Sequence, residues 1–276
     1  MIVRFLIIVL AMVASACSTS PTGRSQFMII SPQAAIVQSQ KAYADTVKQL
    51  GSKDQLSSDH RLADRVQRIT GRLVTTAHDH YPSSRSWDWS VALIDDPDTV
   101  NAWCMAGGRM AVYTGLFEQL KLSDDEFAQI MGHEIAHALA NHTAEQMSRA
   151  VAMQIGLSAI SAASDGNNAA TQGAQLAAVL ALQLPNSRTA ESEADTIGLE
   201  LATLAGYDPQ AAVSLWRKMG DLNDKRPPEF LSTHPDPSTR LGALELHASE
   251  VAGMNPKRIK APIYPINIVY QKDAPN

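Results

Sequence analysis

The stretch "IMGHEIAHALANH", from Ile130 to His142, decides the fold of this chain. Two of its histidines, His133 and His137, stand four residues apart, so on a helix they lie on one face. The preceding "SDDE", which begins at Ser123, has the form of a capping box, and apolar residues follow it at helical spacing. The sequence therefore predicts a helix that begins near Ser123 and carries both histidines.

The residue types on this helix suggest metal chemistry. Two imidazoles on one face can converge on a single zinc ion at about 2.0–2.1 Å per Zn–N bond. Glu134 is rotated by roughly 100° from His133, which places it beside the ion, where it can take a proton from a metal-bound water. This is the H-E-x-x-H arrangement of metallopeptidases. The motif fixes only three positions, so an alternative interpretation remains. In that interpretation the two histidines are simply hydrogen-bonded on a partly exposed face of the helix.

A catalytic zinc needs a third protein ligand and one open position. The three-histidine pattern of the metzincins would require glycine and histidine where this chain has Ala140 and Thr143. His142 is one position too early, so we expect it to be exposed or to cap a helix.

The other source of a third ligand is a glutamate on a later helix, and "SRTAESEADTIGLELA" offers two, Glu191 and Glu193. They point about 200° apart on a helix, so only one of them can face the metal. The spacing alone leaves the choice between the two glutamates open.

H-E-x-x-H followed further along by E-x-x-A-D resembles the zinc peptidase family of the HtpX and CAAX prenyl endopeptidase type. The matching residues here run from Glu191 to Asp195. The resemblance implies one Zn²⁺ per chain with Glu191 as its third ligand, and Asp195 as the acceptor that orients a ligand histidine. It leaves Glu193 as a solvated acid and makes Arg188 a brace for the site.

The resemblance extends to "NAWCMAGGRMAVYTGLF", where Gly107-Gly108 predicts a hairpin. In the family this segment is an edge strand, which implies that the strand binds a substrate peptide by main-chain pairing. An ordinary structural hairpin is the alternative. Cys104 and the Met105-Ala106 pair depart from the family pattern. The implied substrate strand consists of Asn101, Ala102, Trp103, Cys104, Met105 and Ala106.

"STHPDPSTR" is similar to the family's S-T-H-P-x-x-x-x-R, which implies that His234 and Arg240 stabilise the oxyanion of the reaction. Two alternatives stay open for His234: it occupies the open zinc position and holds a latent state, or it is a loop histidine. The resemblance covers about Ile30 to Ala252 and is nearest to periplasmic lipoprotein members of the LoiP, YcaL and BepA kind. The tetratricopeptide array of BepA has no counterpart here.

The N-terminal sequence predicts an exported lipoprotein. Residues 1–16 carry one positive charge and an apolar run that ends in small residues, as in a secretory signal peptide. "ASAC" resembles a bacterial lipobox, which implies lipidation of Cys17, and Ser18 then favours the outer membrane. Ordinary signal cleavage is the alternative. Residues 17–31 read as the lipidated N-terminus and a flexible tether. Cys104 would then lack an intramolecular partner and serve as a small buried hydrophobe.

We expect residues 32–255 to form one zinc metallopeptidase domain of mostly helical α+β architecture, with the small sheet of a gluzincin beside the active-site helix. Residues 256–276 read as a C-terminal tail. A helical hairpin over 150–185 lies between the two zinc-bearing segments, where it could act as a lid. The formal net charge of −5, without blocks of like charge, argues against nucleic acid as a partner.

Together these features predict a zinc endopeptidase of the bacterial envelope that cleaves unfolded or misassembled proteins, with the outer-membrane assembly machinery as a candidate partner. One rival is a catalytically latent periplasmic chaperone or assembly factor, although a pure binder would have no use for Glu134. A second rival is an aminopeptidase, but no acidic group that would hold a substrate amine is evident from the sequence.

Overall fold

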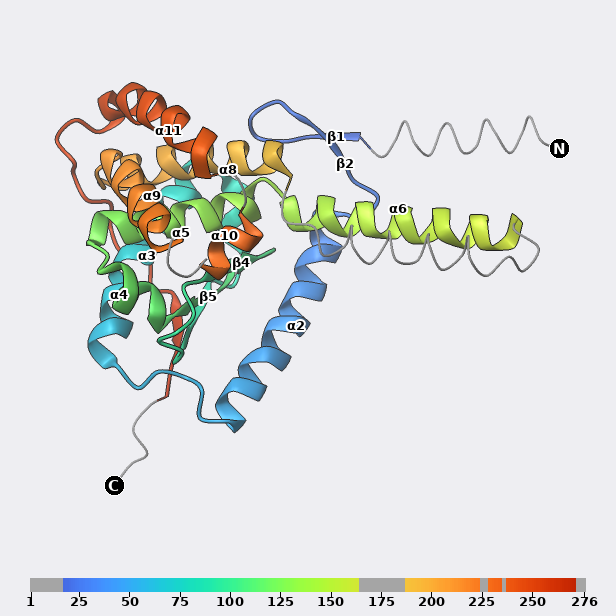
Figure 1. Cartoon of the computed structure of the whole chain (residues 1–276), viewed down its shortest axis with the longest axis horizontal. Coiled ribbons are helices and arrows are strands. Elements are labelled where there is room, and N and C mark those ends of the chain that lie inside the picture. Colours follow the sequence, from blue (N-terminus) through green and yellow to red (C-terminus); the bar gives the residue numbers. More distant parts are fainter. Residues whose placement is uncertain (1–16, 164–186, 224–227, 235–236, 272–276) are drawn as a thin grey trace. The chain divides into compact units, whose positions relative to one another are not determined.

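The computed structural model describes residues 17–163, 187–223, 228–234 and 237–271 (Figure 1). The chain divides into two compact units, one made of Met1–Ala35 with Ala140–Leu184 and the other of Ile36–Leu139 with Pro185–Asn276. The larger unit contains both the H-E-x-x-H helix and the later helix with Glu191.

Helices make up most of the larger unit, and the sequence accounts for where they begin. Ser123 and Glu126 form the predicted capping box, since each side chain bonds the other residue's backbone N–H, at 3.1 and 2.8 Å. Asp59 and Ser187 cap two further helices through their side-chain oxygens. The helices are α2 (Pro32–Ser52, whose first residues belong to the smaller unit), α3 (His60–His80), α4 (Thr114–Leu120), α5 (Asp124–Leu139), α8 (Arg188–Leu204), α9 (Gln210–Asn223), α10 (Glu229–Thr233) and α11 (Pro237–Val251), with 3-10 turns η1 (Pro82–Ser86) and η2 (Ala252–Met254).

A four-stranded sheet of order β4-β5-β3-β6 packs beside α5. The predicted hairpin is confirmed: β4 (Ala102–Met105) and β5 (Arg109–Tyr113) are antiparallel, and Gly107 and Gly108 between them both have positive φ. The central strand β3 (Ser90–Ile94) is buried along its whole length and runs parallel to both β5 and β6 (Asn267–Val269). The predicted mostly helical α+β architecture with a small sheet is therefore confirmed.

The segment expected to be a C-terminal tail is instead built into the larger unit up to residue 271. We call residues 255–269 the C-terminal strap. Its backbone bonds α3 and the end of α8, through Tyr264 N to Gly71 O and Ala261 N to Ala205 O, both at 3.1 Å. A Cβ on Gly71 would lie 2.5 Å from the Tyr264 carbonyl oxygen, so the strap fits only against glycine there. The strap ends as β6, whose pairing partner β3 lies too far away in the sequence for local periodicity to reveal it.

The smaller unit pairs β1 (Cys17–Thr19) with β2 (Ser25–Phe27) and contains α6 (His142–Ala163). Arg24 donates two hydrogen bonds to the buried Glu145 of α6, at 3.0 and 2.7 Å, and Gln26 adds a third at 3.0 Å. The expectation of a flexible tether over 17–31 is therefore wrong for this stretch, because a buried carboxylate must be paired. His142, which was expected to be exposed or to cap a helix, is buried at the first residue of α6.

The predicted hairpin over 150–185 is described only in its first part, since α6 ends at Ala163 and residues 164–186 lie outside the described chain. Its role as a lid stays a prediction.

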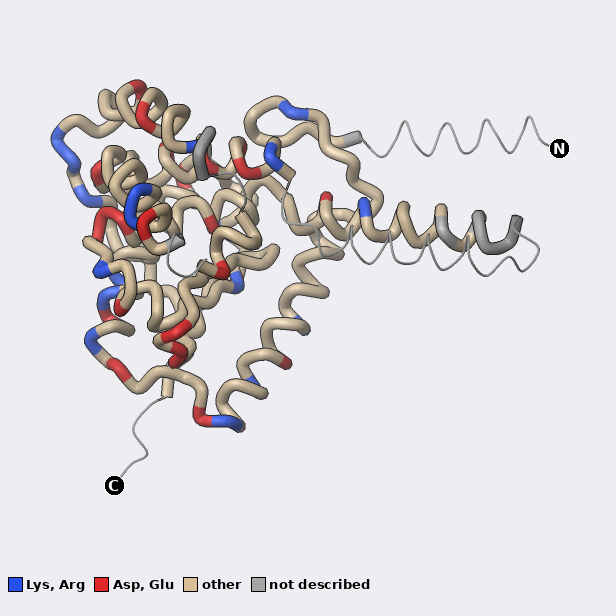
Figure 2. Tube along the Cα trace, viewed as in Figure 1, with Lys and Arg blue, Asp and Glu red and all other residues tan. Residues whose placement is uncertain are grey.

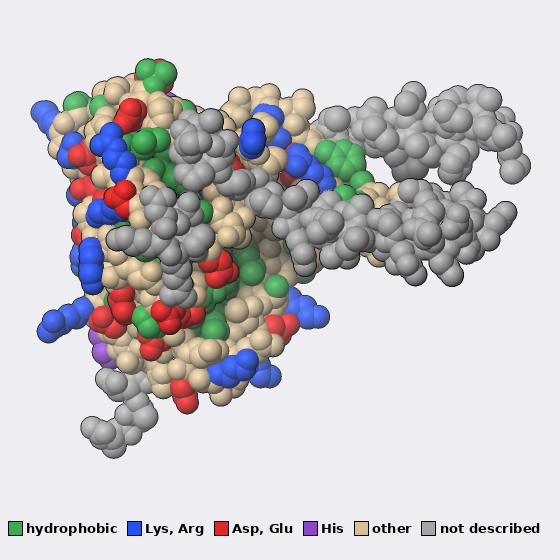
Figure 3. All heavy atoms as spheres, viewed as in Figure 1, with side chains coloured by type: hydrophobic (Ala, Val, Ile, Leu, Met, Phe, Trp, Pro, Cys, Tyr) green, Lys and Arg blue, Asp and Glu red, His purple; other side chains and the backbone are tan. Residues whose placement is uncertain are grey.

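Charged residues of both signs are interspersed along the trace in Figure 2, and the sequence has no long block of one sign. On the face shown in Figure 3, hydrophobic side chains are visible in small groups between polar and charged ones. No helix within the described ranges has the length and apolar character needed to cross a bilayer.

Candidate metal centre

The site begins where α5 and α8 cross, because each helix has a glycine at the crossing point. A Cβ on Gly132 would lie 2.7 Å from the Gly198 carbonyl oxygen, and one on Gly198 would lie 2.7 Å from the His133 backbone nitrogen. The two backbones are therefore in direct contact. This close approach lets His133, next to the crossing point, reach Glu191, which lies two turns earlier on α8.

Four buried side chains converge here, two from α5, one from α8 and one from the residue that follows α10. His133 Nε2 lies 3.1 Å from His137 Nε2 and 3.2 Å from His234 Nδ1. The carboxylate of Glu191 lies 3.3 Å from His133 Nε2, 3.4 Å from His137 Nε2 and 3.0 Å from His234 Nδ1. One ligand atom from each of the four residues lies within 4.8 Å of the other three. These side chains surround one point.

The donor set fits a metal ion. The Nδ1 atom of His133 lies 3.0 Å from Asp195 Oδ1, so this nitrogen carries the proton, and Nε2 is left with a lone pair facing His137 and Glu191. Imidazole lone pairs and a carboxylate gathered at one buried point can together bind a divalent cation. Imidazole nitrogens with one carboxylate are typical zinc ligands, although other divalent ions accept the same donors.

The pKa values of the site agree with this interpretation. Burial lowers the pKa of His133, but hydrogen bonds to Asp195 and Glu191 outweigh it and raise the pKa to about 9. Burial raises the pKa of Glu191, yet its hydrogen bonds to His133 and His234 bring the pKa well below the ordinary value. The carboxylates of Glu191 and Asp195 thus favour a positive charge at His133, and a metal cation that displaced the Nε2 proton would be favoured by the same two carboxylates.

Glu134 lies beside the four converging residues rather than among them, as its position on the helix predicts. Only 3 % of its surface is exposed, and burial raises its pKa. Its Oε1 atom is 3.4 Å from His234 Nε2, but has no hydrogen-bond partner among the described residues. An unpaired buried carboxylate oxygen is costly, and such groups mark places where water or a reacting group binds.

Arg240 lies behind the ligands. Its Nε donates to Asp195 Oδ2 at 2.8 Å, and its Nη2 donates to the other oxygen of Asp195. Its Nη1 donates to Glu191 Oε2 at 3.0 Å. These bonds hold both carboxylates in place, and the predicted role of Arg240 at the oxyanion stays a prediction.

Two residues around Glu191 differ from expectation or stay untested. Glu193 is buried, with 5 % of its surface exposed, so it is not the solvated acid expected from the sequence. Arg188 is exposed at the first residue of α8, and its bracing role stays a prediction.

Among the described residues, the strand β4 lies at the edge of the sheet and pairs with β5 alone. Ala102 and Cys104 are buried and Trp103 and Met105 are half-buried, while the flanking Asn101 and Ala106 are buried. Cys104 is a buried thiol, as predicted, and burial raises its pKa well above the ordinary value. A free strand edge beside α5 suits main-chain pairing with a peptide, which stays a prediction.

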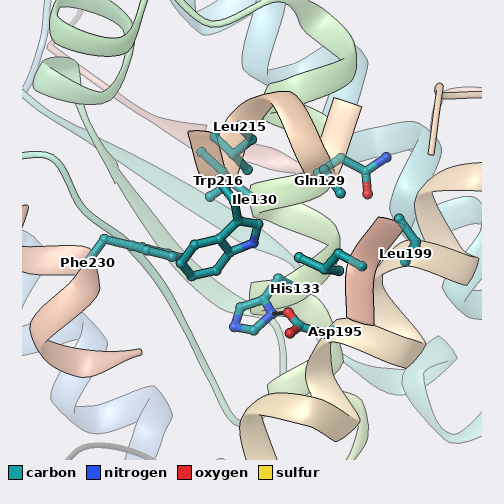
Figure 4. Close-up of a pocket in the computed structure, with 10 residues that line it drawn as sticks. Gln129, Ile130, His133, Asp195, Leu199, Leu215, Trp216 and Phe230 are labelled. Atoms are coloured by element: carbon teal, nitrogen blue, oxygen red, sulfur yellow. Dashed lines mark ion pairs between the residues drawn. The ribbon is translucent and has the colours of Figure 1, made fainter. Parts of the chain in front are cut away.

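Two aromatic residues at the site were missed from the sequence. Trp216 of α9 and Phe230 of α10 form a wall of a small cavity next to His133 and Asp195 (Figure 4). In the sequence Trp216 is one apolar residue of an amphipathic helix, and Phe230 lies in a stretch that reads as a Pro-rich loop. The feature of the sequence that could have indicated Phe230 is its position shortly before His234 in the chain. The cavity is lined by Gln129, Ile130, His133, Asp195, Leu199, Ala212, Leu215, Trp216, Phe230 and Leu244.

Comparison with known proteins identifies the family. The model of peptidase family M48 matches residues 60–248. A mitochondrial metalloendopeptidase OMA1 from Schizosaccharomyces pombe is 32 % identical over 210 residues, which is 75 % of this chain and 58 % of the relative. The OMA1 of Arabidopsis thaliana is 38 % identical over 152 residues, 55 % of this chain and 30 % of the relative.

A bacterial relative gives a similar result. The beta-barrel assembly-enhancing protease of Escherichia coli K12 is 30 % identical over 219 residues, 75 % of this chain and 43 % of the relative. The chain thus spans less than two thirds of the length of each of these relatives, and the narrower likeness to periplasmic lipoproteins stays a prediction. The matched region includes the H-E-x-x-H helix, Glu191 and the segment with His234, and the chain belongs to peptidase family M48.

Proposed function

We propose that this chain is a zinc-dependent endopeptidase. The observation that carries the proposal is the convergence of His133, His137 and Glu191 on one point. Beside them lies a buried carboxylate oxygen of Glu134 that has no hydrogen-bond partner among the described residues. The family and the names of its relatives, which are metalloendopeptidases and a protease, support the same activity.

Each residue of the site has its own role in the proposed hydrolysis. His133, His137 and Glu191 would hold the ion, which when bound supplies a Lewis acid for the scissile carbonyl and for the attacking water. Glu134 accepts the proton of that water and delivers it to the leaving amine. Asp195 keeps the Nδ1 proton of His133 in place, so that Nε2 remains a ligand atom.

A latent resting state is a second candidate for this form of the chain. His234 Nδ1 lies as close to Glu191 and His133 as the two histidines of α5 lie to each other. In this position His234 would take the fourth ligand position, which the attacking water needs. His234 would have to move before catalysis, and from the displaced position it is a candidate for stabilising the oxyanion.

The proposed substrates are unfolded or misassembled proteins of the bacterial envelope. The edge strand β4, with Asn101 to Ala106 along it, would pair with the main chain of an extended peptide, a mode of binding that tolerates many sequences. The proposed location is the periplasmic face of the outer membrane, with residues 1–16 as signal peptide and a lipid on Cys17. One relative's name refers to beta-barrel assembly, which supports the outer-membrane assembly machinery as a proposed partner.

The test is degradation of casein by residues 18–276 with added zinc, with a chelator, and in the Glu134→Gln variant. Glu193→Gln is the matched control, since it changes a buried acid of α8 that is not one of the four converging residues. Cleavage lost with the chelator and in Glu134→Gln, but kept in Glu193→Gln, would support the proposal. Cleavage by His234→Ala with an inactive wild type would support latency. Zinc binding without cleavage by either protein would favour the chaperone.

An aminopeptidase is separated by comparing peptides with free and acetylated N-termini. An endopeptidase cleaves both kinds at internal bonds, whereas an aminopeptidase requires the free amine.

A further inference from the structure

The guanidinium carbon of Arg240 lies over the indole ring of Trp216 inside the larger unit. The Arg240 Cζ atom is 4.0 Å from the centroid of the Trp216 ring. Both residues are buried, with 6 % and 7 % of their surfaces exposed. A guanidinium donates hydrogen bonds only in its own plane, so a buried one needs an aromatic or apolar group against its faces. Trp216 supplies such a group.

Three nitrogens of Arg240 donate to the carboxylates of the metal centre. Nε and Nη2 bond the two oxygens of Asp195, and Nη1 bonds Glu191. Such a fork requires a fixed orientation of the guanidinium plane. The indole that lies against the guanidinium limits its rotation, and a cation over an aromatic face is stabilised most strongly where water is excluded.

Asp195 connects the orientation of Arg240 to that of the ligand histidine, His133. Its Oδ1 atom accepts from Arg240 and also lies 3.0 Å from His133 Nδ1, so Arg240 and His133 share one oxygen. If the guanidinium turned, Asp195 would be free to turn with it, and His133 would lose the partner that fixes its ring and its tautomer. The contacts thus run from α9 through α11 and α8 to α5.

We propose that Trp216 is a positioning residue of the metal centre, which acts on His133 through Arg240 and Asp195. Figure 4 shows the indole next to the ring of Phe230 and near the His133–Asp195 pair. A smaller side chain at position 216 would enlarge the cavity beside Asp195 and admit water, which would compete for the hydrogen bonds of Asp195. This proposal depends on one part of the proposed function, namely that the site around His133 holds a metal ion.

The experiment measures zinc affinity of the full chain by competition with a chelator in wild type, Trp216→Leu and Trp216→Phe. We expect about tenfold weaker binding in Trp216→Leu and partial recovery in Trp216→Phe, which keeps an aromatic face. Met219→Leu is the control, because Met219 is fully buried on the same helix and is not one of the residues lining the cavity. It should lose stability without losing affinity.

A double-mutant cycle separates positioning from general loss of packing. In an Asp195→Asn background, Trp216→Leu should change zinc affinity less than twofold, because the path it acts on is already broken. The same tenfold loss in both backgrounds would overturn the proposal. Zinc affinity equal to that of the wild type in both Trp216→Leu and Trp216→Phe would also overturn it. If Trp216→Leu fails to fold, Trp216→Phe and Trp216→Met carry the comparison.

One measurement needs no metal at all. The Nδ1 proton of His133, held by Asp195, should be visible in a nitrogen–proton spectrum of the imidazoles of the wild type and lost or shifted in Trp216→Leu. An unchanged signal in Trp216→Leu would refute the positioning role, even if the wild type bound no zinc and the proposed function failed.

Discussion

The crossing of α5 and α8 gives the sharpest test of how this fold builds its site. In Gly198→Ala the new Cβ would lie 2.7 Å from the His133 nitrogen and 2.8 Å from Gly132 C and from His133 Cα. Carbon atoms in contact normally lie about 3.5–4.0 Å apart, so the two helices must separate by roughly 1 Å. All three contacts are with backbone atoms, which cannot rotate out of the way.

Two energies oppose each other in this variant. Overpacking of a buried contact costs about 1–3 kcal/mol, whereas replacing glycine by alanine inside a helix stabilises the helix by about 1 kcal/mol. The net loss of stability should therefore be about 0–2 kcal/mol, and the protein should fold. The site would suffer more, because metal–ligand distances tolerate only about 0.2 Å, and a misplacement of about 1 Å can cost about 100-fold in rate.

The assay compares urea unfolding, zinc affinity and casein cleavage for wild type, Gly198→Ala and Gly220→Ala. Gly220 is a glycine of α9 whose added Cβ would meet nothing within 4 Å, so this control should keep its activity and lose no stability. We expect Gly198→Ala to lose at least about tenfold in cleavage and in zinc affinity. Wild-type affinity and rate in Gly198→Ala would show that the crossing does not set the ligand positions.

Other predictions concern the strap, one carboxylate and the thiol. Gly71→Ala should lower the free energy of unfolding by about 1–3 kcal/mol in urea titrations, because its Cβ would lie 2.5 Å from Tyr264 O, and an unchanged midpoint would contradict this. Burial raises the pKa of Glu126, but the Lys218 hydrogen bond and those from Ser123 and Ser214 outweigh it and lower the pKa. Its ionised form therefore stabilises the fold above about pH 4.5, the unfolded value, and this stability is lost as the pH falls through the lower folded value. Glu126→Gln should flatten that acid-side loss in thermal melts, and an unchanged acid-side slope would count against it. Cys104 should resist iodoacetamide in the native protein and react only in denaturant, as followed by mass spectrometry, since burial raises its pKa.

Much of this fold was predictable from local patterns. The capping box at Ser123, the glycine pair of the hairpin and the i, i+4 histidines are all short-range signals, and the structure has the helix and hairpin that they predict. The convergence of Glu191 and His234 on the α5 histidines was expected only from a family resemblance. Spacing alone could not choose between Glu191 and Glu193, because the two point in different directions from one helix and the sequence does not show which direction faces the histidines.

The parts that were missed depend on contacts between distant segments. The pairing of β6 with β3, the β1–β2 pair held to α6 by Arg24, and the packing of Trp216 against Arg240 all join residues far apart in sequence. Neither periodicity nor motif spacing contains such information. An apolar residue on an amphipathic helix looks the same whether it packs against a leucine or against the guanidinium of a metal centre.

The strap also has a kinetic consequence. In β3 and β6, Ser90 pairs with Asn267, so the sheet beside the active-site helix is complete only when residues from opposite parts of the chain have met. Non-local parallel pairing of this kind raises the contact order, and folding slows as contact order rises. During synthesis β3 leaves the ribosome long before its partner exists, and until then one of its edges stays unpaired and open to association with other chains.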